Sequence, residues 1–360
     1  MGVYILLTLV TCLTLMGVQR LKQKYAFAML GKDKVASQRN VGFLITFLIL
    51  AFFASVRDGV GCDYESYVMH IQRIQMGNQN YMEIGFQWVC RQIAKIDSNP
   101  RLVIIIFAVA TCFFYLRAIW DQSEDPLFSV FLFLTWGYYF MTFNTIRNYF
   151  ALAVAVFAIK YLDKKKYIHF ILLIIVSSLF HKSALVCIPL YLLATKKYRL
   201  KHIYILLGVL IVAILFKDPI RALMFEFYPS YEGGAYDTGR VSYLNIIKAL
   251  VVLVLCGLFW DKIKDEKLAR IYFNLNLFAF VLYTAFYWIP EISRIGFYMN
   301  ATTILLLPNL AIRVGKVSKY SVKFLIGAFS VVLFVLLLIE FQDETTRLLP
   351  YKTWLFDGSF

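Results

Sequence analysis

An arginine and a histidine stand at the two outer ends of a stretch that has the pattern of a membrane hairpin. The segment 144–193 opens with Arg147 before an apolar run, reaches three lysines at 164–166, and returns through a second apolar run to His181. Because lysines collect on the cytoplasmic side, the pattern predicts that Arg147 and His181 meet at the outer end of the hairpin. Charged groups at membrane depth are costly and usually face a protein interior or a wet cavity. These two residues are therefore the first candidates for chemistry.

Three more arginines, Arg57, Arg240 and Arg294, fall on the same predicted outer side as Arg147. Guanidinium groups that converge in a low-dielectric cavity suit a phosphate or diphosphate, since the planar fork binds such oxygens in pairs. The alternative is that each arginine pairs with a local carboxylate or extends to lipid headgroups. We expect the set to stabilise a developing negative charge, with Arg57, Arg147 and Arg294 as catalytic candidates.

The candidates for proton transfer are His181, Asp63 and Glu83. Histidine titrates near working pH, so His181 could act as a general base or donate to a leaving oxygen, or it could be structural. Asp63 could deprotonate a sugar hydroxyl, or balance Arg57 and hold its loop, and the sequence does not separate these roles. For Glu83 the sequence favours the balancing role.

Tyrosines are abundant on the outer side, and their rings with a polar tip suit sugar faces, although most also fit an ordinary interfacial belt. The expected substrate-binding residues are Tyr64, Tyr67, Glu83, Asn144, Lys182, Asp237 and Arg240. The sequence contains no metal-ligand spacing, phosphate-binding glycine loop or nucleotide fingerprint, so we expect no metal and no cofactor. Because the exterior of a bacterial membrane lacks nucleotides, a transfer reaction there should use a lipid-linked donor.

Composition indicates a polytopic membrane protein with an all-α fold. The chain is 61% hydrophobic with a mean hydropathy of +0.68. Runs of about 20 apolar residues, each long enough to cross hydrocarbon, recur along it. The alternation typical of an outer-membrane barrel is absent.

About 11–12 transmembrane helices are expected, together with short amphipathic helices and outer-face loops. The expected spans are 2–19, 41–56, 102–119, 127–143, 147–162, 167–180, 183–195, 203–217, 242–260, 271–289, 296–312 and 324–341. The two near 167–195 are short and could form a broken pair.

The basic residues alternate between the connections. One alternate set of connections holds 23 of the 37 Lys and Arg residues in a short total length. This positive-inside pattern places both termini outside and accounts for the net charge of +15 without nucleic acid. We expect one transmembrane domain over 1–341, with the outer loops 57–101 and 217–241 forming part of the site cavity, and a polar tail over 342–360.

The N-terminus and two cysteines of the outer loop give two further expectations. The N-terminus lacks a basic leader and a small-residue cleavage site, so it is expected to be a retained first span. Cys62 and Cys90 share one predicted outer loop, and whether they form a disulfide is left open.

The outer motifs resemble those of the EpsG family, the Wzy-like polysaccharide polymerases of bacterial envelopes. The resemblance rests on R-x-G-V-G-x-D-Y-x-x-Y (57–67), E-x-G-F (83–86), I-R-N (146–148), F-H-K-S-A (180–184) and S-R-I-G-x-Y (293–298), and covers about 1–340. It implies a fold related to the GT-C glycosyltransferases. Carried over by position, it points to Arg57, Asp63, Tyr64, Arg147, His181 and Arg294.

The resemblance also implies a metal-independent reaction in the bacterial inner membrane. A growing glycan would pass from undecaprenyl diphosphate onto the non-reducing end of a lipid-linked repeat unit at the periplasmic face. The expected partners are the undecaprenyl-diphosphate-linked oligosaccharide, membrane lipid and a chain-length regulator protein, and no nucleic acid. The alternatives are a ligase-type transferase with the same donor, an acyltransferase with His181 as base, and a transporter or flippase of the glycolipid. A transporter predicts internal repeats and charge at mid-membrane, whereas here the unusual residues collect on one face.

Overall fold

The structure, a computed structural model, describes residues 1–27, 32–78, 80–198, 200–227, 232–233, 239, 241–290 and 292–356. Throughout these residues the regular secondary structure is helical, and the β pairing is limited to an isolated antiparallel bridge between Arg57 and Thr353. Five of the described helices are long and apolar enough to cross a membrane: Gly2–Leu21, Pro100–Gln122, Lys267–Ala285, Ile292–Arg313 and Lys319–Glu340. Five shorter apolar helices accompany them. The all-α polytopic fold expected from the sequence is confirmed.

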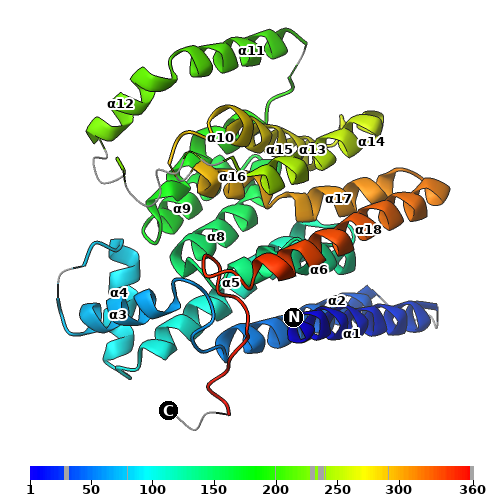
Figure 1. Ribbon diagram of the computed structural model, residues 1–360. Coiled ribbons are helices and arrows are strands. Elements are labelled where there is room, and N and C mark those ends of the chain that lie inside the picture. Colours follow the sequence, from blue (N-terminus) through cyan, green and yellow to red (C-terminus); the bar gives the residue numbers. More distant parts are fainter. Residues whose placement is uncertain are drawn as a thin grey trace. The chain divides into compact units, whose positions relative to one another are not determined.

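The chain divides into two compact units, residues 1–185 with 315–360, and residues 186–314. The division falls within the single expected domain, and whether the units act as one transmembrane domain stays a prediction. The first unit holds α1 (Gly2–Phe27), α2 (Lys32–Ser55), α3 (Tyr64–Gln75), α4 (Ile84–Ala94), α5 (Pro100–Gln122), α6 (Pro126–Thr135), α7 (Tyr138–Met141), α8 (Ile146–Asp163), α9 (Tyr167–Ser178) and α18 (Lys316–Glu340) (Figure 1). The 3₁₀ helix η1 (Lys182–Val186) ends at the division.

Local sequence sets where several of these helices begin. Pro100 opens α5, and the side chain of Asn99 accepts a hydrogen bond from Arg101 N at 3.0 Å. Pro126 opens α6 in the same way, with Asp125 accepting from Phe128 N at 3.2 Å. Proline suits the first helical turn, where its missing N–H has no partner in any case, and Asn or Asp before it satisfies a neighbouring N–H.

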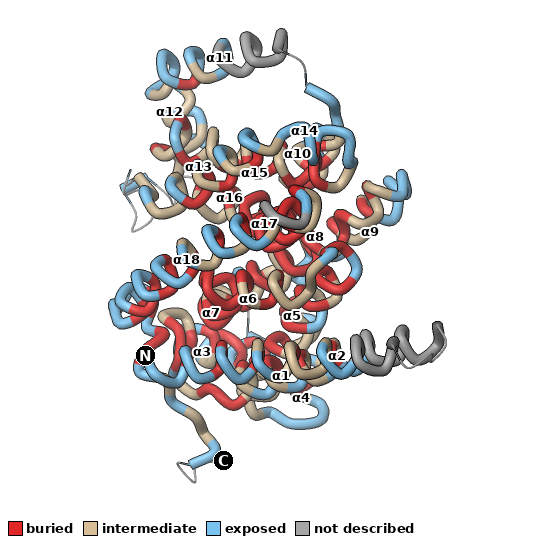
Figure 2. The backbone as a smooth tube through the Cα atoms, turned by 90° about the vertical axis from the view of Figure 1, so that its right-hand side faces the viewer, coloured by how far each residue is buried: buried red, intermediate tan, exposed pale blue. Residues whose placement is uncertain are grey.

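The core of the first unit forms where α5 packs on α8. The two helices run in the same direction, as Phe107 contacts Phe150 and Phe114 contacts Phe157, each with ring centroids 5.4 Å apart. Helix α8 also carries four buried alanines, Ala151, Ala153, Ala155 and Ala158, which let neighbouring helices approach closely. In Figure 2 the turns of α5 and α8 are largely buried, whereas α1 and α2 keep an exposed side. This packing fixes the start of α8, and with it Arg147.

The amphipathic helices expected in the loop 57–101 are α3 and α4. They pack on each other and on α5, at the end of the unit where α5 begins (Figure 1). Their buried sides meet in a core that includes Tyr67, Ile71, Phe86 and Ile93. Both helices are thus held on the bundle by apolar burial and carry polar residues at their ends.

The segment after α18 is fastened to the loop that follows α2. Trp354 N donates to Val56 O at 3.2 Å, and Gly61 N donates to Arg347 O at 2.8 Å. The ring of Tyr351 stacks on Phe53 with centroids 4.2 Å apart. The expected polar tail therefore packs, through residues 346–354, along the loop that carries Arg57.

The second unit contains α10 (Cys187–Ala194), α11 (Leu200–Leu215), α12 (Lys217–Phe227), α13 (Tyr243–Leu258), α14 (Trp260–Ile263), α15 (Lys267–Ala285), α16 (Ile292–Asn300) and α17 (Thr303–Arg313). Helix α15 packs against α10, α13, α16 and α17. Buried polar groups join these helices: Asn276 Nδ2 donates to Thr302 Oγ1 at 3.1 Å, and Thr303 Oγ1 donates to Asn276 Oδ1 at 2.7 Å.

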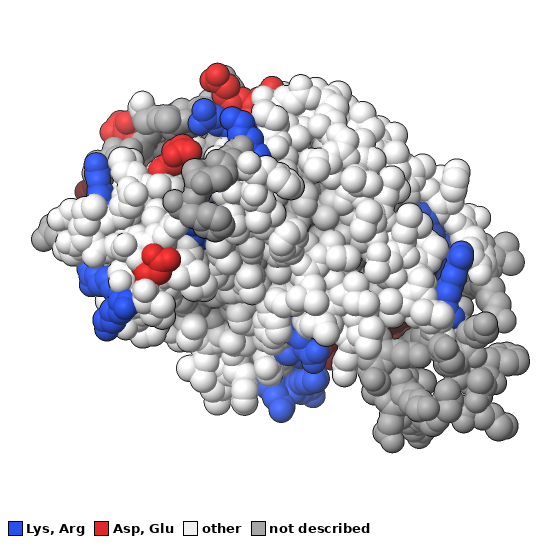
Figure 3. Space-filling view, turned by 90° about the horizontal axis from the view of Figure 1, so that it is seen from below, with Lys and Arg blue, Asp and Glu red and all other residues white. Residues whose placement is uncertain are grey.

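Two expected spans are interrupted. The span 127–143 becomes α6 and the short α7, because Gly137 has a φ of 80° and turns the chain. The span 183–195 starts as η1 and continues as α10, and whether it forms a broken pair with α9 stays a prediction. The face seen in Figure 3 has a broad uncharged area with charged side chains towards its margins, as a surface in contact with lipid requires.

Candidate active site

A carboxylate, a guanidinium and an imidazole meet at the end of the first unit where α4 and α8 begin. Glu83 Oε2 pairs with Arg147 Nη1, and Glu83 Oε1 lies 3.4 Å from His181 Nδ1. The side chains of Glu83, Arg147 and His181 are only 11%, 13% and 15% exposed, so solvent screens them weakly. The expected meeting of Arg147 and His181 is thus mediated by Glu83, which contacts both.

The position of Glu83 follows from how α4 is anchored. Glu83 is the N-cap residue of α4, yet its side chain makes no capping hydrogen bond and contacts Arg147 and His181 instead. Gly85 N donates to Leu179 O at 2.8 Å, and a Cβ on Gly85 would lie 2.7 Å from that oxygen. Only glycine allows this close approach of two backbones. The contact brings Glu83 beside the residues that follow α9.

Tyr67 completes the surroundings of Arg147. Arg147 Nε donates to Tyr67 Oη at 3.3 Å, and the guanidinium carbon lies 5.8 Å and 5.7 Å from the ring centroids of Tyr67 and Phe86. Burial raises the pKa of Tyr67, so its hydroxyl stays neutral and accepts from the arginine. Within the described part of the chain, the third nitrogen, Nη2, makes no hydrogen bond. That donor is available to a ligand oxygen.

Asp63 lies one helical turn before Tyr67, at the N-cap of α3. Its charge acts on Tyr67, because it contributes to raising the tyrosine pKa. The structure therefore places Asp63 close to the Arg147 group through Tyr67.

Tyr64 belongs to a neighbouring polar network. Its hydroxyl donates to Asp58 Oδ1 at 2.9 Å, and Asp58 Oδ2 pairs with Arg101 Nη2 at 2.9 Å. Burial and the hydrogen bond to Asp58 raise the pKa of Tyr64. This network ties the loop after α2 to the start of α5, and Tyr64 is only 4% exposed.

Arg57 is buried beneath this loop and is 2% exposed. Its Nη1 donates to Ala54 O, and its guanidinium carbon lies 4.8 Å from the centroid of the Phe143 ring. A carbonyl and an aromatic face are both suitable partners for a cation that lacks a carboxylate. With these contacts, Arg57 fastens its own loop to the end of α2.

Asn144 and Lys182 hold backbone segments beside the site. Asn144 Oδ1 accepts from Cys62 N at 3.0 Å, which fixes the loop before α3. The backbone N–H of Lys182 donates to Glu83 Oε1 at 3.3 Å, while its side chain is exposed. The carboxylate of Glu83 is therefore held from α8, from His181 and from the start of η1.

The remaining expected residues lie elsewhere. Arg294 is on α16 in the second unit, so its contribution to the same site stays a prediction. Asp237 and Arg240 lie outside the described residues.

Possible metal ligands and the cysteine thiols are two further features of the described side chains. Among these residues no three or more His, Cys, Asp or Glu side chains gather as they would around a metal ion. All six cysteines are free thiols, which answers the open question about Cys62 and Cys90. Burial raises the pKa of the Cys62 and Cys90 thiols to about 11 and about 12, so both stay protonated near neutral pH.

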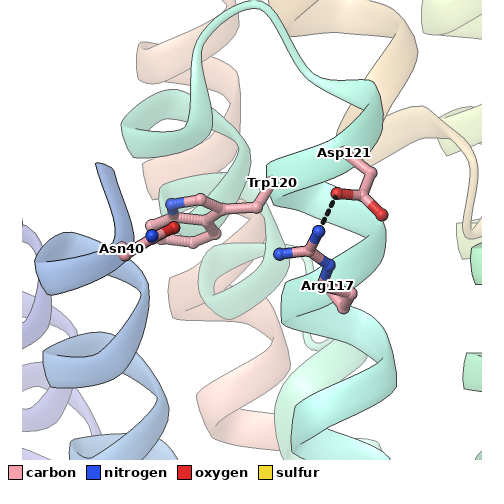
Figure 4. A pocket seen from close by; sticks show the side chains of 4 residues that line it. All are labelled: Asn40, Arg117, Trp120 and Asp121. Carbon is pink, nitrogen blue, oxygen red and sulfur yellow. Dashed lines mark ion pairs between the residues drawn. The ribbon is translucent and has the colours of Figure 1, made fainter. Parts of the chain in front are cut away.

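An open pocket of about 240 Å³ lies at the other end of α5, lined by Asn40, Arg117, Trp120 and Asp121 (Figure 4). Arg117 Nη2 pairs with Asp121 Oδ1 at 2.9 Å, and Lys160 Nζ pairs with Asp121 Oδ2 at 2.8 Å. With 1.5 Å per helical residue, Arg117 is about 24 Å along α5 from Arg101. The pocket is therefore separate from the Glu83 group, on the side to which the basic residues assign the cytoplasm.

Several residues around the site were not singled out from the sequence. Asp58 pairs with Arg101, 43 residues away, and Trp354 of the strap 346–354 contacts Ser55, 299 residues away. Gly85 had a local signal, the E-x-G-F motif, whose glycine makes the close contact with Leu179. Neighbours more than 90 residues away cannot be read from such local patterns.

The apolar helices define a multi-pass membrane protein, and the Glu83, Arg147 and His181 side chains form a polar site in its first unit. The model of the EpsG family matches residues 40–353, and the chain belongs to this family. It is a family of Wzy-like polysaccharide polymerases, which are glycosyltransferases of exopolysaccharide biosynthesis. No curated protein and no solved structure matches the chain.

Proposed function

We propose that this protein polymerises a polysaccharide at the outer face of the bacterial inner membrane without a metal ion. It transfers a growing glycan from undecaprenyl diphosphate onto the non-reducing end of a second lipid-linked repeat unit. The observation that carries the proposal is the contact of Glu83 with both Arg147 and His181. The family membership supports the class of reaction, and the distribution of basic residues supports the orientation.

In the proposed reaction the bond between sugar C1 and the diphosphate oxygen breaks, and C1 bonds to a hydroxyl oxygen of the acceptor. The electron pair of the broken bond leaves on the diphosphate, and Arg147 stabilises this charge. Because Arg147 is positioned by Glu83 and Tyr67 before substrate binds, little reorganisation is required. Arg294 is proposed as a second cation for the leaving group, with Arg240 as the alternative.

The acceptor hydroxyl loses its proton to His181. A carboxylate next to Nδ1 favours the tautomer with the proton on Nδ1, which leaves the lone pair on Nε2 as the base. Asp63, one turn from Tyr67, is the alternative proton acceptor. Asp237 and the exposed Lys182 are proposed to contact substrate, whereas Tyr64, Asn144 and the buried Arg57 are proposed to position the loop.

The test uses purified full-length protein in nanodiscs with an undecaprenyl-diphosphate-linked repeat unit as the single substrate. We expect a ladder of lipid-linked oligomers that forms equally well in the presence of EDTA. Glu83→Gln and His181→Ala should retain the wild-type elution profile but form polymer at least about a hundredfold more slowly, and His181→Ala should also retain the wild-type thermal transition. Polymer formation that stops in EDTA would contradict metal independence, and full activity in both variants would contradict the assignment of the site.

A further inference from the structure

Helix α4 is apolar on two sides, although it lies in an outer loop. One side packs in the core through Phe86, Cys90 and Ile93. On the other side Ile84 and Trp88 are 72% and 61% exposed. The two residues are four apart, so they form one row along the helix. A row of large exposed apolar side chains beside a polar site indicates contact with an apolar ligand or with lipid.

A second exposed row runs along α9, and the helices that carry the two rows meet at Gly85 and Leu179. It consists of Leu172, Ile175, Val176 and Leu179. The spacing of three and four residues places them on one side of the helix. At its end, Leu179 O accepts the hydrogen bond from Gly85 N in α4. Since a Cβ on Gly85 would already collide with Leu179, no side chain separates the two helices at that contact.

The point where the two helices meet is also where the charged group begins. Glu83 lies two residues before Gly85, and His181 lies two residues after Leu179. A cation, a carboxylate and an imidazole thus adjoin an apolar row that continues for about 10 Å along α9, at 1.5 Å per residue. This combination suits an amphiphile whose anionic head sits at Arg147 and whose tail descends along the helices.

We propose that Ile84 and Trp88 of α4, with the row on α9, bind the isoprenoid chain of the lipid-linked donor next to its diphosphate. This inference rests on the proposed function and names the tail subsite of the same site. Inside a bilayer the tail already lies in hydrocarbon, so the rows contribute mainly by orienting the first isoprene units and thereby the diphosphate. We therefore expect a modest effect on donor affinity that depends on the length of the chain.

The experiment compares two donors that carry the same glycan, one on undecaprenyl diphosphate and one on methyl diphosphate, which has no isoprene unit to contact the rows. The variant is Ile84→Ala with Trp88→Ala, and the matched control is Leu44→Ala with Leu48→Ala on α2, which are 51% and 55% exposed and also four residues apart. We expect the α4 variant to raise KM for the undecaprenyl donor about threefold to tenfold with kcat retained, and to leave KM for the methyl diphosphate donor unchanged. The control should change neither.

An unchanged ratio of the two KM values, or an equal change in the control, would overturn the inference and assign the row to bulk lipid contact. If the wild type uses neither donor, the proposed function fails instead, so the two failures are distinct.

A second measurement does not depend on activity or on the stability of the alanine variant. Benzoylphenylalanine in place of Trp88 should crosslink to a radiolabelled undecaprenyl diphosphate, and excess unlabelled compound should compete. The same replacement of Leu48 should give no competed crosslink. Absence of a competed crosslink at position 88 would also overturn the inference.

Discussion

Glu83 and Arg147 are 64 residues apart in the chain and form an ion pair where α4 and α8 begin. Both side chains are largely shielded from solvent, and the same carboxylate contacts His181. The pair joins the segment between α3 and α4 to the start of α8, and it also positions the cation and the base that we propose for glycosyl transfer from a diphosphate. A structural and a catalytic role therefore coincide in Glu83.

Replacement of Glu83 by glutamine should remove the charge of this side chain while keeping its size. The amide keeps the size of the side chain but leaves Arg147 without its counter-ion, which should cost about 1–3 kcal/mol of stability. We expect polymerisation by purified protein to fall at least about a hundredfold, because Arg147 and His181 both lose their orientation. The exposed Glu65→Gln on α3 is the control and should behave as the wild type. Wild-type rates in Glu83→Gln would exclude a role of the carboxylate in catalysis.

Gly85→Ala should push α4 away from α9. The added methyl would lie 2.7 Å from Leu179 O and 2.9 Å from Leu179 Cβ, so the backbones must move apart. We expect about 1–3 kcal/mol of destabilisation, measured by thermal unfolding in detergent, and a loss of polymer. Gly17→Ala on α1 has no atom within 4 Å of the new Cβ and should be neutral. A Gly85→Ala variant as stable and active as the wild type would show that the contact can relax at no cost.

Truncation should show that residues 346–354 belong to the folded unit. A stop after Thr345 removes the carbonyl of Thr346 that accepts from Cys62 N and the carbonyl of Arg347 that accepts from Gly61 N. A stop after Phe356 keeps both. We expect the shorter chain to accumulate poorly and to be digested within residues 57–63 by limited proteolysis, and the longer one to match the wild type. Equal protection of the two chains would contradict the role of the strap.

His70 should make the α3–α4 pair sensitive to acid. Its Nδ1 lies 3.1 Å from Asn80 Nδ2, a donor, so the ring is neutral, and Nε2 lies 3.1 Å from Tyr81 Oη. Burial, with the charges of Arg73 and Arg147, lowers the pKa of His70 below its ordinary value near 6.5. The unfolded chain therefore binds the proton first, and stability declines as pH falls below about 6.5 until the lowered pKa is passed.

The measurement is thermal unfolding at pH 7.5 and 5.5 for wild type and His70→Gln. The variant should lose part of the difference between the two pH values, since glutamine does not titrate. The same difference in both proteins would assign the acid sensitivity to other groups.

The sequence predicted the helices well, because runs of apolar residues and proline or asparagine at helix starts are local signals. It also predicted that Arg147 and His181 would lie near each other, since a hairpin brings its ends together. The contact of Glu83 with both charged partners was not predicted. It depends on how two helices pack at Gly85 and Leu179. The assignment of Arg57 to the catalytic residues stays a prediction, and its burial against Phe143 depends on a partner 86 residues away that no local pattern identifies. Residues 346–354 were expected to belong to a polar tail, because their partners in the loop after α2 are also distant in sequence.

The most direct test of the central claim is the glycolipid profile of cells that lack this protein, complemented with wild type, Arg147→Lys or Arg147→Ala. Single repeat units on lipid should accumulate at the outer face, and wild type should restore the ladder. Arg147→Lys should restore it poorly, since lysine lacks the fork that contacts Glu83 and Tyr67 together, and Arg147→Ala should not restore it. Units that collect on the inner leaflet would indicate a flippase, and long lipid-linked chains that stay unattached would indicate a ligase. A complete ladder in cells with Arg147→Ala would contradict the assignment of this arginine to the reaction.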